Sequence, residues 1–61
     1  MRHELGTAIR EDRQRQGLSI FRLAVISETS VSSINLAERG ATSLKMLEKI
    51  SAALKRNKAH R

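Results

Sequence analysis

The side chains that usually carry enzymatic or metal chemistry are scarce in this sequence. There is no Cys, and the two His residues, His3 and His60, lie near opposite ends of the chain. No pair of acidic residues has a spacing that would force two carboxylates together, and neither a Gly-rich phosphate loop nor a metal-ligand cluster occurs. We therefore expect a protein that is not an enzyme and that uses no metal or other cofactor.

The basic charge of the chain indicates chemistry of another kind, the electrostatic binding of a polyanion. Twelve Lys and Arg residues stand against six Asp and Glu residues, which gives a net charge of +6 on 61 residues. The usual partner for such a balance is nucleic acid, although the same charge also keeps a surface soluble. Because Phe21 is the single aromatic residue, stacked single-stranded bases and a membrane surface are poorer partners.

The length of the chain indicates one small domain. A chain of this size buries only about 60% of its unfolded surface, and no disulfide is available to stabilise it. Helical packing or a partner subunit must therefore supply stability. No apolar run approaches the roughly 20 residues of a membrane span, and no signal peptide opens the sequence. We expect a soluble intracellular protein.

Apolar residues recur at intervals of three and four, which is typical of amphipathic α-helices. Gly17 and Gly40 suit the left-handed stop that ends many helices, while Ser19 and Ser30 suit the N-terminal cap. The sequence therefore predicts an all-α fold without strands. The expected helices span about residues 1–16, 20–27, 31–38 and 44–54. We expect residues 1–54 to form the domain and the basic tail, 55–61, to be disordered or to begin a further element.

Two helices of this pattern, joined by a polar break of about three residues, lie between Leu18 and Gly40 and predict a helix-turn-helix. Two details around them stay open. Gly6 in the first helix either permits close approach of another helix or is merely tolerated near a frayed end. Phe21, Val25 and Ile26 either form an exposed patch that binds a protein or complete the core.

A set of residues at characteristic spacing extends through the whole predicted domain. It consists of Leu5, Gly6, Ile9, Arg10, Arg13, Gly17, Leu18 and Ser19, then Leu23 and Ala24, then Ser30, Ile34 and residues 38–40, and finally the segment 43–54. In this register the sequence resembles the Cro/C1-type (XRE) helix-turn-helix family. The resemblance implies a lambda-repressor-like bundle of four helices, or five if another helix follows.

The resemblance also implies a function, sequence-specific DNA binding by a repressor-like transcription regulator. Such a protein acts in the cytoplasm, on the DNA of a bacterium or phage. Its recognition helix, residues 31–38, lies in the major groove. By resemblance the base-reading positions are Val31, Ser32 and Leu36, with Asn35 beside them.

Further roles carry over from the family to residues that hold the helix or contact phosphates. Ala24 is small enough to let the two helices cross closely, and Ile34 anchors the second against the first. Glu38 is expected to pair with Arg13, which also approaches a phosphate. The expected phosphate contacts are Arg13, Ser19, Thr29, Ser30 and Arg39.

The turn between the two helices departs from the family pattern at Glu28, where relatives usually carry Gly. A non-glycine residue in a left-handed turn costs of order 1 kcal/mol, which a small domain tolerates. Ser27 and Thr29 also stand where relatives commonly have apolar residues.

Two partner interpretations follow. In the first, double-stranded DNA is bound by a homodimer on an inverted repeat. In the second, the chain is a protein-interaction or antitoxin-type module that keeps the fold and binds a protein through Phe21 and Val25.

Overall fold

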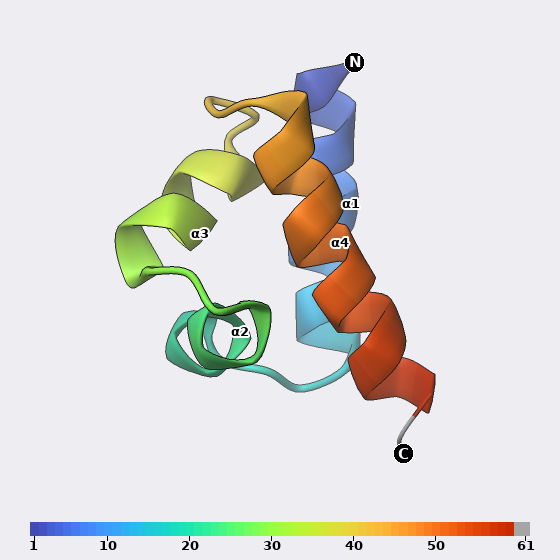
Figure 1. The fold of residues 1–61 in the computed structure, drawn as a ribbon. Helices are drawn as coiled ribbons and strands as arrows, with labels where there is room; N and C mark the ends of the chain where they lie inside the picture. The colour runs from blue at the N-terminus through green and yellow to red at the C-terminus, as the bar shows by residue number, and fades with distance from the viewer. Residues whose placement is uncertain (60–61) are drawn as a thin grey trace.

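Four α-helices follow one another along the chain in the computed structural model, which describes residues 1–59 (Figure 1). They are α1 (Arg2–Arg15), α2 (Ile20–Ser27), α3 (Val31–Glu38) and α4 (Leu44–Ala59). No strand occurs in the described range. The predicted all-α fold of four helices is therefore confirmed, and the predicted bounds of α2 and α3 agree with the observed ones.

Serine side chains begin three of the helices, as the sequence indicated. The Oγ atom of Ser19 accepts a hydrogen bond from the backbone N–H of Arg22 at 2.9 Å. Ser30 caps α3 in the same way at 3.1 Å, and Ser43 accepts from the third residue of α4 at 3.2 Å. Each hydroxyl satisfies one of the N–H groups that a helix leaves unpaired at its start.

Left-handed residues end the helices at the predicted places. Gly17 and Gly40 both have φ of +71°, and Glu28 has φ of +57° at the end of α2. Among residues 1–59, Glu28 is the one non-glycine residue with positive φ. The sharp reversals after α2 and α3 let these short helices turn back onto the same core.

The core lies where α2 and α3 pack against α1 and α4. Figure 1 shows α1 and α4 side by side and running in the same direction, with α2 and α3 on one flank. The buried side chains that form the main cluster come from every helix. They are Ile9, Leu23, Ala24, Ile34, Ala37, Leu47, Ile50 and Leu54.

The prediction that α4 stops near Leu54 was wrong, because the helix continues to Ala59. Two hydrogen bonds attach the extension to the end of α1. The side chain of Gln16 donates to the backbone carbonyl of Leu54 at 3.1 Å and accepts from the amide of Asn57 at 2.7 Å. Residues 55–59 of the predicted tail are thus helical, while His60 and Arg61 lie outside the described residues.

Gly6 permits the close approach of α1 to the end of α3. A Cβ atom placed on Gly6 would lie 2.4 Å from the carbonyl oxygen of Ala37 and 2.8 Å from the backbone nitrogen of Gly40. Both neighbours are backbone atoms, so a larger residue would push the two helices apart. Of the two interpretations of Gly6, the structure supports the close approach.

Replacing Gly6 by alanine should therefore destabilise the domain, although alanine is the better helix former. We expect Gly6→Ala to lower the free energy of unfolding by about 2 kcal/mol, because the added methyl group meets rigid backbone. Urea unfolding followed by circular dichroism measures it. The matched control is Ala8→Gly at an exposed α1 position, which should cost about 1 kcal/mol from helix propensity alone. A more stable Gly6→Ala variant would contradict the proposed contact.

Candidate nucleic-acid interface

The corner between α2 and α3 is held by hydroxyl groups rather than by apolar side chains. Ser27 is 2% exposed, and its Oγ atom donates to the carbonyl of Leu23 at 2.6 Å. The hydroxyl groups of Ser27 and Thr29 also lie 2.9 Å apart in a hydrogen bond. The polar residues of this turn thus satisfy one another. Thr29, a predicted phosphate contact, is half-buried and lies in this corner.

Ala24 and Ile34 lie in the interior of the domain. Ala24 is 4% exposed, and Ile34 is completely buried. Both belong to the main core cluster. These contacts hold the inner side of α3 and leave its outer side in solvent.

An ion pair joins α1 to the end of α3. The Nε atom of Arg13 donates to Oε2 of Glu38 at 2.6 Å, and an Nη atom lies 3.4 Å from the other carboxylate oxygen. Arg13 also donates to the carbonyl of Leu18 at 2.8 Å. The two charged side chains are only 11% and 9% exposed. The predicted pairing is therefore present, and it uses three of the five N–H groups of the guanidinium.

A polar hollow lies beside this pair, between α1, α2 and α3. Its volume is about 440 Å³. The lining residues are Arg10, Arg13, Ile20, Asn35, Glu38 and Arg39. Arg10 and Arg39 are exposed and form no ion pair with any residue in the range 1–59. The hollow therefore carries two guanidinium groups that can bind an anion.

Arg10 is the basic residue of this hollow that was not predicted as a contact. It lies one turn before Arg13 on α1, so the two side chains are expected on neighbouring parts of one helix face. That spacing was the available signal. The sequence did not show that Arg39, 29 positions further along the chain, lines the same hollow.

The outer side of α3 presents the predicted base-reading residues. Ser32 and Asn35 are exposed, and Val31 and Leu36 are 41% and 39% exposed. They form two neighbouring rows of residues four apart along the helix. Asn35 also lines the polar hollow, so it lies between the exposed side of α3 and the guanidinium groups. The hydroxyl groups of Ser19 and Ser30 are engaged as helix caps.

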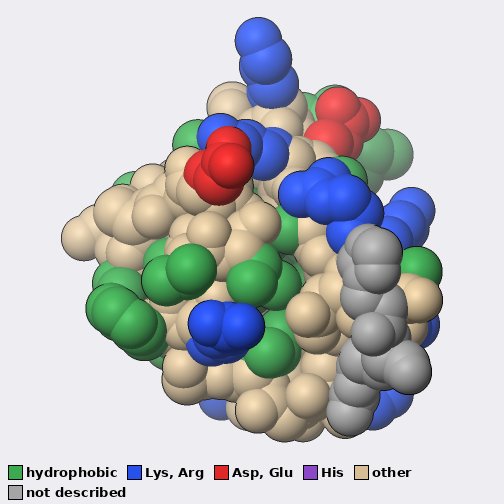
Figure 2. All heavy atoms as spheres, turned by 60° about the horizontal axis from the view of Figure 1, so that its bottom comes forward, with side chains coloured by type: hydrophobic (Ala, Val, Ile, Leu, Met, Phe, Trp, Pro, Cys, Tyr) green, Lys and Arg blue, Asp and Glu red, His purple; other side chains and the backbone are tan. Residues whose placement is uncertain are grey.

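The apolar residues of α2 divide between the two interpretations left open above. Ile26 is half-buried and packs against the core. Phe21 and Val25 are 69% and 51% exposed, so they form a surface patch instead. In the view of Figure 2, hydrophobic side chains gather over α2, and basic side chains lie among and beside them.

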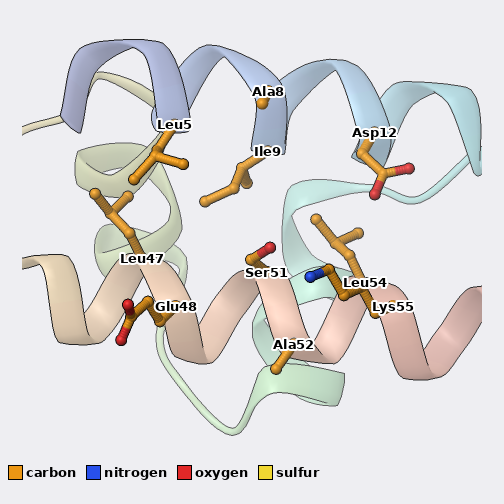
Figure 3. A pocket seen from close by; sticks show the side chains of 10 residues that line it. All are labelled: Leu5, Ala8, Ile9, Asp12, Leu47, Glu48, Ser51, Ala52, Leu54 and Lys55. Atoms are coloured by element: carbon orange, nitrogen blue, oxygen red, sulfur yellow. The ribbon is translucent and has the colours of Figure 1, made fainter. Parts of the chain in front are cut away.

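A second hollow, called the α1–α4 groove below, lies between α1 and α4 on another side of the molecule. Figure 3 shows Leu5 and Ile9 of α1 pointing toward α4, and Leu47 and Leu54 of α4 pointing toward α1. Its volume is about 380 Å³, and Lys55 lies on its lining. None of the predicted site residues lines this groove, so it is separate from the α3 surface.

Within residues 1–59, no group of three His, Cys, Asp or Glu residues is arranged to hold a metal ion. Over the same range, no helix has both the length and the apolar character needed to cross a membrane. Comparison with known proteins found no matching family model, no matching curated protein and no matching solved structure. The function proposed below therefore rests on the geometry of α3 and of the polar hollow.

Neutralising Glu38 should destabilise the domain strongly, because the largely buried Arg13 charge then keeps the carbonyl of Leu18 but no carboxylate as its partner. We expect Glu38→Gln to lower the free energy of unfolding by about 3 kcal/mol, measured by urea unfolding. The control Glu11→Gln changes an exposed carboxylate on α1 and should stay within about 0.5 kcal/mol of the parent. The double replacement Arg13→Met with Glu38→Leu should recover part of the loss. If Glu38→Gln and Glu11→Gln are equally stable, the structural role of the ion pair is contradicted.

Proposed function

We propose that this chain is a Cro/C1-type DNA-binding transcription regulator that places α3 in the major groove of double-stranded DNA. The observation that carries the proposal is the arginine hollow, formed by Arg10, Arg13 and Arg39 beside the exposed side of α3. A groove reader needs this combination, because phosphate contacts position the protein while an exposed helix face reaches the bases. We propose a repressor-like role in the cytoplasm, on bacterial or phage DNA.

Charge and helix geometry support the phosphate contacts. The net charge of +6 attracts the duplex over a long range. Among the described residues, Arg10 and Arg39 have no carboxylate partner. Arg10 lies on α1 and Arg39 directly follows α3, and both line the hollow. The starts of α2 and α3 add backbone N–H groups, because each serine cap satisfies only one of the unpaired donors.

Two copies on an inverted repeat would strengthen binding. A dimer brings its recognition helices about one DNA turn apart, and each copy then contributes its own arginine hollow. We propose this arrangement for high-affinity operator binding, with each protomer covering one half-site.

Removing one arginine of the hollow should weaken DNA binding and reduce its dependence on salt. We expect Arg10→Ala and Arg39→Ala each to lower the magnitude of the slope of log affinity against log salt concentration by about 1. Fluorescence anisotropy with a labelled genomic duplex between 50 and 200 mM salt, a range of about fourfold, measures the slope.

The matched control for these variants is Lys55→Ala, which removes the same charge from the α1–α4 groove. It should leave the slope nearly unchanged. Equal effects of Lys55→Ala and Arg10→Ala would indicate diffuse charge attraction and contradict a phosphate site in the hollow. Failure of the parent chain to bind duplex at the lowest salt would contradict the proposed function itself.

The second candidate is a protein-interaction or antitoxin-type module, and the exposure of Phe21 and Val25 favours it. An apolar interface responds little to moderate salt, whereas DNA binding weakens steeply.

If Phe21 and Val25 pair two copies, the combined variant Phe21→Ser with Val25→Ser should elute as a monomer where the parent elutes as a dimer. Its stability should change by less than about 1 kcal/mol, since both side chains are largely in solvent. A parent dimer that persists in the variant would exclude this patch as the dimer interface.

A further inference from the structure

The exposed side of α3 has an unusual chemical composition for a helix that reads bases. From its first residue, Val31, to Ala37, the helix carries no charged side chain, and its last residue, Glu38, is paired with Arg13. The commonest specific contact in the major groove is an Arg or Lys side chain on guanine. No residue of α3 itself can make that contact.

Two branched aliphatic side chains take the place that polar readers usually occupy. Val31 and Leu36 are 41% and 39% exposed. The inner side of α3 is already filled by Ile34 and Ala37, which are completely buried. Val31 and Leu36 therefore add an exposed apolar surface that the core of the domain does not use.

The major groove offers one characteristic apolar group to such side chains, the 5-methyl group of thymine. The arginine side chains near α3 do not compete with this contact between aliphatic side chains and thymine methyl groups. Arg10, Arg13 and Arg39 line the polar hollow toward α1, where they suit phosphates. Ser32, exposed between the two aliphatic side chains, bonds to any base and imposes no preference for guanine.

We propose that α3 selects A·T base pairs by packing Val31 and Leu36 against thymine 5-methyl groups. This inference rests on the proposed function and names its target class. Val31 and Leu36 are five residues apart, so the two side chains lie about 7.5 Å apart along the helix axis. Five residues also correspond to about 140° around the helix, so the two side chains face different bases. The target therefore presents one thymine methyl group to each of the two side chains in the major groove.

The experiment compares thymine with uracil, which has the same hydrogen-bonding edge but lacks the methyl group. The full chain first selects its best duplex from a random-sequence library. That duplex is then resynthesised with uracil in place of individual thymines, and affinities are compared. Burial of one methyl group corresponds to about fourfold in affinity. We expect about a fourfold loss at each of two thymines and about a fifteenfold loss when both are replaced.

Protein variants assign the effect to individual side chains. Val31→Ala should lose the preference for thymine at one position, and Leu36→Ala at the other, so that thymine and uracil bind equally there. The matched control is Leu44→Ala, an exposed aliphatic residue on α4, which should keep both preferences. Circular dichroism checks that each variant remains folded.

The outcomes separate the two levels of the proposal. A selected duplex rich in G·C pairs, or equal binding of its thymine and uracil forms, overturns methyl recognition and leaves DNA binding in place. Thymine preference that survives in Val31→Ala and Leu36→Ala also overturns the assignment. Absence of duplex binding at low salt overturns the proposed function together with this inference.

Discussion

The ion pair between Arg13 and Glu38 is the constraint on which the α3 surface depends. It joins the first helix to the last turn of the third, 25 positions away, and the same guanidinium holds the carbonyl of Leu18. One side chain therefore fixes α1, the loop before α2 and α3 relative to one another. Because the chain has no Cys to form a disulfide and its core is small, this polar link is an important addition to the apolar packing. The pair also forms part of the arginine hollow, so fold stability and anion binding share one residue.

Close packing at the same end of α3, and beneath the helix, completes the arrangement. Gly6 lets α1 lie against the carbonyl of Ala37, and Ile34 is completely buried beneath the helix. With its inner side fixed at both points, α3 has little freedom to rotate. Which residues face solvent is then decided by the helical period alone. The apolar character of Val31 and Leu36 thus becomes a property of the binding surface and not of the core.

Local signals were sufficient to predict much of the fold. The serine caps and the left-handed residues Glu28 and Gly40 determine the bounds of α2 and α3 through hydrogen bonds within a few residues, so the sequence displays them directly. The register of the family resemblance also placed Arg13 opposite Glu38. The end of α4 was not predictable in this way, since its last turns depend on Gln16, which is distant in sequence. That Arg10 and Arg39 line the same hollow could likewise be seen only in the packed structure. The role of α3 on DNA stays a proposal.

The most direct measurement is a ¹H–¹⁵N nuclear magnetic resonance titration of the chain with a DNA duplex at low salt. If α3 enters the major groove, the largest shift changes will fall on the amides of residues 30–36 and on the backbone around Arg10 and Arg39. Residues of the α1–α4 groove, such as Ala8 and Ala52, will change little. Changes confined to that groove, or to Phe21 and Val25, would contradict the placement of α3 in DNA.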